Sequence, residues 1–549
     1  MSSNIQFYKN LFNEKKYNEI IDKIEKLEKD KSAQILHILG ICKMLKDNTN
    51  SKDSLSAKEN FREAFLKEKN TNLGIEALTN FINISTNFFE IDDSLKYYSE
   101  IKGYSLKNMK LLKAISRLYQ FSVRINDRIK ILEHIIRLDP SSLDDWCSYI
   151  YINNFSKTWD QEKFYLITKE FSKNIKKINL KPLKLDKSVL KRKIKIAFFS
   201  SDICQSHSIT YFLTGLLENL DQNKFEMYAI SNAIKDVNNE NYRKLFNNWF
   251  NIRNLNDLDA TNFIRDKKID IVVDLMGFTS ENRISILKNK IAPIQISWLG
   301  YCNTSGLEEI DYILSDHHLI HEDEEKFYSE KIIRFEKIWN THQGFKIKRK
   351  KSLSPFIKNK YITFGSFNNF NKISNQTLKT WARILKNIKN SKLLLKSSMK
   401  FNLQDFKRRL NELNIKNQVE IQDRSESFEE HLNYYEKVDL ALDTFPYNGV
   451  TTTFEAIWKG IPIITMEGYN FNSRCGSSII KNLNYENLIA KDEEDYIAKA
   501  IFYSNNLNKL AEIRDNIFET ALRSPLFDNK FFTKNFEKII NDIIIKELN

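Results

Sequence analysis

Short apolar runs rich in β-branched and aromatic residues alternate with amphipathic stretches from about residue 190 to the end of the chain. A first set of runs reads "IKIAFFSS", "KFEMYAIS", "IDIVVDLMGF", "IQISWLG" and "DYILSD". A second set reads "YITFGSFNNF", "SKLLLKSS", "QVEIQD", "VDLALDTF" and "IPIITME". Such alternation predicts an α/β fold with a parallel sheet, because parallel strands need helical crossovers. Two sets predict two Rossmann-like lobes.

The residues before these runs have helical periodicity. "AQILHILGICKML" and "AKENFREAFLKE" predict a helix pair, in which Gly40 and Ala64 allow a close approach. Pairs of this kind resemble degenerate tetratricopeptide repeats, and an irregular helical bundle is the alternative. We expect a helical domain at 1–185, a first lobe at 190–345 and a second lobe at 355–549. The polar stretch "FKIKRKKSLSPFIKNK" reads as the linker between the lobes.

Composition narrows the class of protein. The 549 residues carry a net charge of +14, which favours an anionic partner. Basic and aromatic residues are not interleaved, so the sequence does not predict a nucleic-acid surface. The five cysteines are widely spaced, which argues against a disulfide framework or a zinc knuckle. The first residues lack the apolar core of a signal peptide, and no apolar run is long enough for a membrane span. We expect a cytoplasmic protein.

The stretch "DLALDTFPYNGVTTTFEAIWKG" predicts a strand, a turn and a helix. Asn448 and Gly449 lie in the turn, and Thr451 to Thr453 open the helix. Hydroxyls together with the unpaired N–H groups of a first helical turn form a phosphate site. Glu455, one turn further along, is placed to accept hydrogen bonds from ribose hydroxyls. The alternative is an ordinary threonine N-cap.

Two further polar loops follow predicted strands. In "FGSFNNFNKISN", Asn369 and Lys372 lie at a strand end, where a lysine can neutralise a leaving diphosphate. In "FFSSDICQSHSITYF", His207 lies at a helix entry and is able to bind substrate or act as a base. The alternative there is helix capping by Ser206 or Ser208 beside a passive histidine. Because loops at the carboxyl ends of parallel strands meet at one edge, we expect all three loops to line one site between the lobes.

One histidine-rich stretch is a weaker candidate for a metal site. "SDHHLIHEDEE" places His317, His318 and His321 next to acidic residues, and histidines four residues apart can bind zinc. The stretch follows a predicted strand in a loop. We expect no metal there.

Three long motifs resemble the glycosyltransferase family that contains O-GlcNAc transferase and the plant SPINDLY proteins. They are the Asp439-to-Ile480 stretch, the segment "PIQISWLGYCNTSGLEEIDYILSDHHLIHEDEEKFYSEKIIR" and the segment "FGSFNNFNKISNQTLKTWARILKNIKNSKLLL". The resemblance covers about residues 190 to 545, in the same order. It implies a two-lobed GT-B fold, preceded by tetratricopeptide repeats, and an inverting transfer from a nucleotide sugar that needs no metal and no cofactor.

The resemblance also implies roles for single residues. Lys372 matches the lysine that stabilises the diphosphate leaving group, and Thr451 and Thr452 match the pair that binds the phosphates. The remaining positions that it matches are Glu455 at the ribose, His431 at the uracil ring, Asn369 at the diphosphate or sugar, and His207 at the active-site histidine.

Three departures from the family pattern bear on the sugar and the turnover rate. The "DICQSHS" loop is one residue longer than in the family, so Ser206 rather than His207 is the other possible match. Val450 replaces a histidine of the animal enzyme, and Asn371 replaces an aromatic residue.

The function that the resemblance implies is transfer of a sugar, GlcNAc from UDP-GlcNAc first, to serine or threonine hydroxyls of a protein acceptor. The alternatives are another donor, such as GDP-fucose or UDP-glucose, an asparagine acceptor, or a scaffold with weak catalysis. The acceptor proton would pass to His207 or to a phosphate oxygen.

Overall fold

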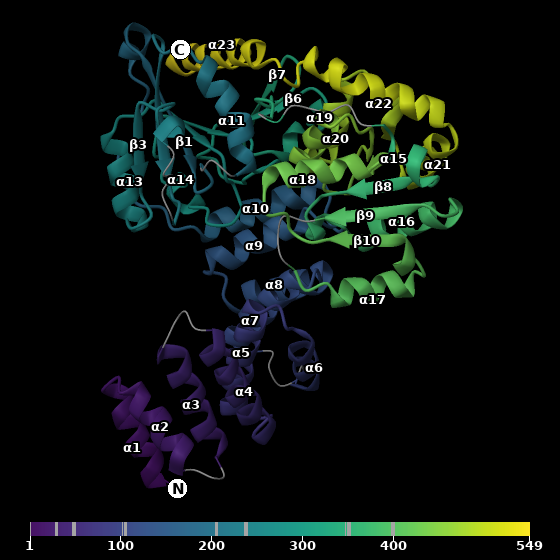
Figure 1. Cartoon of the computed structure of the whole chain (residues 1–549). Helices are drawn as coiled ribbons and strands as arrows, with labels where there is room; N and C mark the ends of the chain where they lie inside the picture. The colour runs from purple at the N-terminus through teal and green to yellow at the C-terminus, as the bar shows by residue number, and fades with distance from the viewer. Residues whose placement is uncertain are drawn as a thin grey trace. The chain divides into compact units, whose positions relative to one another are not determined.

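Figure 1 shows the computed structural model, which describes residues 2–27, 31–46, 51–101, 103, 107–203, 207–234, 240–345, 347, 353–396 and 401–549. These residues form two compact units. The first unit contains the described residues of Met1–Pro140 and Lys400–Arg409. The second unit contains those of Ser141–Met399 and Leu410–Asn549.

The first unit is built from helices packed in sequence order. Its helices are α1 (Ser2–Asn13), α2 (Tyr17–Leu27), α3 (Ala33–Lys46), α4 (Ser51–Lys67), α5 (Asn72–Asn87), α6 (Asp92–Ile101), α7 (Met109–Phe121) and α8 (Ile125–Leu138). A Cβ atom on Gly40 would lie 2.8 Å from the ring of Phe61, and Ala64 is fully buried. The close approach of α3 and α4 is therefore confirmed, whereas their assignment to tetratricopeptide repeats stays a prediction.

The second unit begins with α9 (Leu143–Asn153) and α10 (Gln161–Asn174) and then forms the first lobe. Its sheet has the order β3-β2-β1-β4-β5-β6-β7, and every pairing is parallel. The strands are β1 (Ile194–Ser200), β2 (Phe225–Ser231), β3 (Asn248–Asn251), β4 (Ile271–Asp274), β5 (Ile294–Ser297), β6 (Tyr312–Asp316) and β7 (Lys331–Phe335). The helices are η1 (Lys187–Lys191), α11 (Ser208–Asn219), α12 (Glu240–Arg243), α13 (Asp257–Asp266), α14 (Ile284–Leu287) and η2 (Glu322–Phe327).

The second lobe repeats this architecture. Its sheet has the order β10-β9-β8-β11-β12-β13, again with parallel pairings. The strands are β8 (Thr363–Ser366), β9 (Lys392–Lys396), β10 (Val419–Gln422), β11 (Leu440–Leu442), β12 (Ile463–Met466) and β13 (Ile489–Ala490). The helices are α15 (Pro355–Asn359), η3 (Phe370–Lys372), α16 (Asn375–Asn387), α17 (Gln404–Glu412), η4 (Lys416–Gln418), α18 (Phe428–Tyr434), η5 (Tyr435–Lys437), α19 (Thr451–Trp458), α20 (Phe471–Lys481), η6 (Glu486–Leu488), α21 (Glu493–Asn505), α22 (Leu507–Leu522) and α23 (Asn529–Leu548). Of α17, the residues up to Arg409 belong to the first unit.

These two parallel sheets, preceded by helices, confirm the predicted GT-B class. The boundary predicted at residue 185 differs from the packing, because α9 and α10 belong to the second unit. Phe171 of α10 packs edge-on against Phe278 of the first lobe, and the Gln161 amide donates to Asn303 Oδ1 at 2.8 Å. Helical periodicity marks a buried face, but it does not say which unit covers that face.

The last helix also lies away from its neighbours in sequence. Although α23 follows the second lobe along the chain, it packs on α11 and β7 of the first lobe (Figure 1). Phe532 stacks on Phe335, with ring centroids 4.5 Å apart, and lies beside Trp298. Residues 529–548 therefore complete the first lobe, and not the second as their place in the sequence suggests. No helix in the described ranges has the length and apolarity to cross a membrane.

The packing of α23 predicts a large effect for one substitution. Phe532→Ala removes a side chain that is 2% exposed, and we expect it to lower the free energy of unfolding of the second unit by about 3–5 kcal/mol. Urea unfolding followed by tryptophan fluorescence measures this change, with Trp298 as a nearby reporter. Phe502→Ala is the control, since Phe502 is 42% exposed and its loss should cost less than about 1 kcal/mol. Equal effects of the two substitutions would contradict the packing of α23.

A buried histidine lies where the two lobes meet. The ring of His342 is stacked with Phe454 of the second lobe and contacts Phe212 of the first lobe edge-on. Its Nδ1 accepts the backbone N–H of Gly344 at 2.9 Å. Burial lowers the pKa of His342 to about 3, so the ring is neutral in the folded protein.

This histidine makes the junction sensitive to acid. An unfolded histidine has a pKa near 6.5, so its contribution to stability is complete above that pH and decreases as the pH falls from 6.5 towards 3. We expect a loss of about 2 kcal/mol between pH 7 and pH 5 from this group. Thermal unfolding of His342→Asn should depend less steeply on pH over this range than that of the wild-type protein. Parallel pH dependence in the two proteins would show that folding does not lower the pKa of His342.

Candidate functional site

The helix after β11 begins with open backbone donors. The N-cap of α19 is Val450, whose side chain accepts no hydrogen bond, so the threonines do not cap the helix. Within the described residues, no group accepts the backbone N–H of Thr451 or of Thr452. The Thr453 hydroxyl donates to the carbonyl of Gly449 at 3.0 Å. The positive end of α19 thus presents two free N–H donors, as a phosphate site requires.

Lys372 lies against the turn that precedes this helix. Its Nζ donates to the carbonyl oxygen of Asn448 at 2.9 Å and lies 4.2 Å from the centroid of the Tyr447 ring. Burial lowers the pKa of Lys372, whereas the negative charge of Asp443 opposes that shift. A cationic lysine and two free amide donors therefore belong to one wall, formed by the residues after β8 and β11.

Two asparagines connect the β8 loop to this wall. Asn369 caps η3, and its Oδ1 accepts the backbone N–H of Asn371 at 2.9 Å. The amide oxygen of Asn368 accepts the hydroxyl hydrogen of Thr452 at 2.8 Å. The Thr452 hydroxyl is therefore bonded within the protein, whereas its backbone N–H has no acceptor among the described residues.

His431 and Glu455 contact each other. The Nε2 atom of His431 lies 3.0 Å from Oε2 of Glu455, and its Nδ1 lies 2.9 Å from Nζ of Lys396. The hydroxyl of Tyr435 donates to the same Glu455 oxygen at 2.9 Å and to the carbonyl of Thr452 at 3.2 Å. A lysine ammonium can only donate, so the neutral ring accepts at Nδ1 and carries its hydrogen on Nε2. Sequence reasoning missed Lys396 and Tyr435, which fix the orientation of this ring.

His207 lies on the first lobe, at the start of α11. Its Nδ1 accepts the backbone N–H of Ile209 at 3.4 Å, so the histidine itself caps the helix. Its Nε2 lies 3.9 Å from Oδ1 of Asp202, a carboxyl whose pKa is raised by burial. Ser206, the other possible match, lies outside the described residues. Among the hydrogen bonds and ion pairs of the described residues, none joins His207 to the Lys372 wall.

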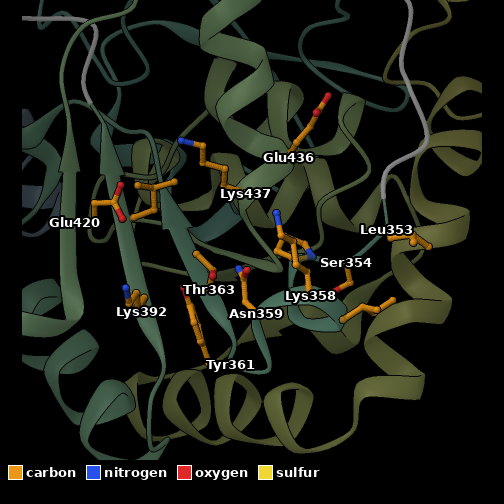
Figure 2. A pocket seen from close by; sticks show the side chains of 13 residues that line it. Leu353, Ser354, Lys358, Asn359, Tyr361, Thr363, Lys392, Glu420, Glu436 and Lys437 are labelled. Carbon is orange, nitrogen blue, oxygen red and sulfur yellow. The ribbon is translucent and has the colours of Figure 1, made fainter.

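Two cavities lie at opposite ends of the second sheet. One, of about 470 Å³, lies where β11 and β12 end, with Phe445, Pro446 and Tyr469 in its lining. The other, of about 560 Å³, lies at the amino ends of β8 and β9 and includes Lys358 and Lys392 (Figure 2). Ligands of such sheets bind beyond the carboxyl ends of the strands, which is where the first cavity lies. Its lining includes Phe445 and Pro446 after β11 but not Lys372, Thr451 or Thr452.

The histidine-rich stretch has structural contacts. The backbone N–H of His318 donates to Oδ1 of Asp316 at 2.8 Å, and His321 begins η2 with a capping box to Glu324. Among the described residues, no three His, Cys, Asp or Glu side chains form a set of metal ligands.

Sequence reasoning also missed a carboxylate behind the wall. Asp443 is fully buried directly after β11, and its Oδ1 accepts the backbone N–H of Gly449 at 2.7 Å. In the sequence, Asp443 is the only charged residue between a buried strand and a glycine-containing turn. This position could have predicted that its carboxylate holds the turn.

Comparison with known proteins agrees with this geometry. The model of glycosyl transferase family 41 matches residues 170–343 and 347–536. A probable UDP-N-acetylglucosamine--peptide N-acetylglucosaminyltransferase SPINDLY from Solanum lycopersicum is 29% identical over 417 residues, covering 74% of this chain and 44% of the relative. The SPINDLY protein of Eustoma exaltatum is 31% identical over 355 residues, covering 63% of this chain and 38% of the relative. The chain thus spans less than half the length of these relatives.

A solved structure shows the same fold. A mutant of the O-GlcNAc transferase of Thermobaculum terrenum superposes with a TM-score of 0.80 at 21% identity, covering 94% of this chain and 99% of that chain. The matched architecture includes both parallel sheets and the helices before them. With the family model matching both lobes, the chain belongs to glycosyl transferase family 41.

Proposed function

We propose that this protein is a glycosyltransferase that moves a sugar, GlcNAc from UDP-GlcNAc first, to a hydroxyl of a protein acceptor. The proposal rests on one observation: Lys372 is bonded to the turn that leads into α19, whose first two backbone N–H groups, those of Thr451 and Thr452, are open. The activity named for the SPINDLY relatives supports a UDP-GlcNAc donor and a peptide acceptor.

The reaction concentrates negative charge on the leaving group. The acceptor oxygen forms a bond to C1 of the sugar while the bond from C1 to the diphosphate oxygen breaks, and the nucleoside diphosphate leaves. The Lys372 ammonium and the positive end of α19 stabilise the charge that develops on this diphosphate. Attack from the face opposite the diphosphate inverts the anomeric carbon.

The acceptor hydroxyl loses its proton in the same step. Because Nδ1 of His207 accepts the Ile209 N–H, the ring hydrogen lies on Nε2, which then has no free lone pair. This arrangement supports a phosphate oxygen of the donor as the proton acceptor. His207 then acts as a hydrogen-bond donor at the site.

Substitution of Lys372 tests the proposal directly. We expect Lys372→Met to lower kcat for sugar transfer by at least a hundredfold, because removal of one electrostatic stabiliser of a leaving group costs about 10²–10³. Radiolabelled UDP-GlcNAc with a hydroxyl-bearing peptide library measures the transfer. Lys379→Met on the outer face of α16 is the control, since that side chain is exposed.

Calorimetry identifies the nucleotide and separates the alternatives. UDP should bind to the wild-type protein in the presence of EDTA and bind more weakly to Lys372→Met. Tight binding of GDP in place of UDP would change the donor to GDP-fucose. Absence of binding by both nucleotides would overturn the transferase proposal and favour a scaffold.

The role of His207 has its own test. His207→Asn keeps an acceptor for the Ile209 N–H and so keeps the cap of α11. We expect kcat to fall by less than tenfold, because a general base contributes about 10²–10⁴ and this histidine is not the base in the proposal. Initial rates from pH 5.5 to 9 measure the change. A loss above a hundredfold, together with disappearance of an acidic limb, would assign the base to His207.

A further inference from the structure

Asp443 is an ionisable side chain at the centre of the second lobe for which the proposed reaction has no direct use. It is fully buried, and both carboxylate oxygens accept hydrogen bonds. Oδ1 accepts the backbone N–H groups of Thr444 at 2.8 Å and of Gly449 at 2.7 Å. Oδ2 accepts the hydroxyl hydrogen of Thr465 at 2.8 Å. A buried charge is costly unless it is bonded in this way.

Two glycines enclose this carboxylate. A Cβ atom on Gly449 would lie 3.1 Å from Oδ1 of Asp443, and one on Gly476 would lie 2.6 Å from Oδ2. Such distances leave no room for a side chain on either side. The position of the carboxylate is therefore fixed by backbone on two sides and by hydrogen bonds on the others.

The carboxylate determines the orientation of a neighbouring amide. Because an ionised carboxylate only accepts hydrogen bonds, Asn368 presents its Nδ2 to Oδ1 of Asp443, at 3.4 Å. The amide oxygen of Asn368 then faces away and accepts the hydroxyl hydrogen of Thr452 at 2.8 Å. The charge of Asp443 thereby fixes Thr452, at the start of α19, through one intermediate side chain.

The same carboxylate acts on Lys372. Its bond to the Gly449 N–H holds the turn whose Asn448 carbonyl accepts the lysine Nζ. In the described part of the chain, no carboxylate lies within 4.0 Å of that ammonium. The negative charge of Asp443 is the largest attraction that opposes the effect of burial on the lysine. Only a protonated lysine neutralises a diphosphate.

We propose that Asp443 is a positioning residue of the donor site: it holds Thr452 and the Asn448 turn in place and keeps Lys372 cationic. The inference rests on the proposed function and deepens it, because Asp443 acts through other residues and touches no substrate.

The test uses an isosteric substitution with a matched control. Asp443→Asn keeps an acceptor oxygen for the Thr444 and Gly449 N–H groups but removes the charge. Asp439→Asn is the control, since Asp439 is equally buried, precedes the same strand and accepts the backbone N–H of Thr363 at 2.9 Å, at the opposite end of the sheet. Thermal unfolding of both variants monitors folding.

Activity and the titration of Lys372 are measured together. We expect kcat/KM of Asp443→Asn to fall at least tenfold and its alkaline limb to move to lower pH, while Asp439→Asn stays within threefold of the wild-type value. Competitive acetylation with mass spectrometry should give a pKa of Lys372 at least one unit lower in Asp443→Asn. The ionisable groups that act on Lys372 and enter this comparison are Asp443, Cys475 and Cys302. The hydroxyl of Tyr496 donates to the backbone carbonyl of Asp443 at 2.8 Å.

The outcomes separate the two proposals. If the wild-type protein binds neither nucleotide, the proposed function fails, yet the pKa of Lys372 in the ligand-free protein still decides whether Asp443 keeps it cationic. An unchanged Lys372 pKa, or activity of Asp443→Asn within threefold of wild type, would overturn the inference.

A second variant covers the case in which Asp443→Asn does not fold. Asn368→Ala interrupts the connection to Thr452 but leaves the charge of Asp443 in place. It should raise the KM for the donor three- to tenfold with little change in kcat and no change in the Lys372 pKa. An unchanged KM would show that the orientation of Asn368 does not matter, and would overturn this part of the inference.

Discussion

Parallel pairing of the strands is the constraint on which the candidate site depends. Every pairing described in the second sheet is parallel, so the residues after β8 and after β11 emerge at the same edge. This brings Lys372 and the start of α19 together although they are about eighty residues apart in sequence. The side chain of Val450, the N-cap of α19, cannot accept a hydrogen bond. The first backbone N–H groups of this short helix are therefore available to bind an anion.

Buried aspartates at strand ends hold the loops of both lobes. Asp274 accepts the backbone N–H groups of Met276 and Gly277 after β4, and Asp316 accepts the hydroxyl of Ser478 across the two lobes. Burial raises the pKa of Asp274, Asp316 and Asp443 to about 6. Each carboxylate therefore costs stability at neutral pH, because its folded pKa lies above the unfolded value of about 3.9. In return, each carboxylate fixes the shape of a loop at the carboxyl edge of its sheet, where ligands bind.

The sequence predicted most of the strands and the residues of the wall, because both leave local patterns. A buried parallel strand reads as an apolar run, and a phosphate site reads as small polar residues after it. The edge strands β3, β7 and β13 were not predicted. In β3 and β7 two apolar residues are flanked by polar or charged ones over only four or five residues, and β13 has two residues. Partners far along the chain also leave no local pattern. The covering of β7 by α23 and the contact of Lys396 with His431 follow from tertiary packing alone.

The junction of the lobes limits how the site can change when a donor binds. The guanidinium of Arg474 on α20 pairs with both carboxylate oxygens of Glu324 in the first lobe, at 2.6 and 2.7 Å, and is almost fully buried. Separation of a buried pair leaves an uncompensated charge, which is strongly unfavourable. On another part of the junction, Phe212 of α11 packs edge-on against Phe454 of α19. Because Phe454 lies within one turn of the open donors of Thr451 and Thr452, rotation of the first lobe would disturb the start of α19, which is proposed to bind the phosphates. Adjustment to a donor is therefore expected in the loop after β8, which carries Asn369, and not in the angle between the lobes.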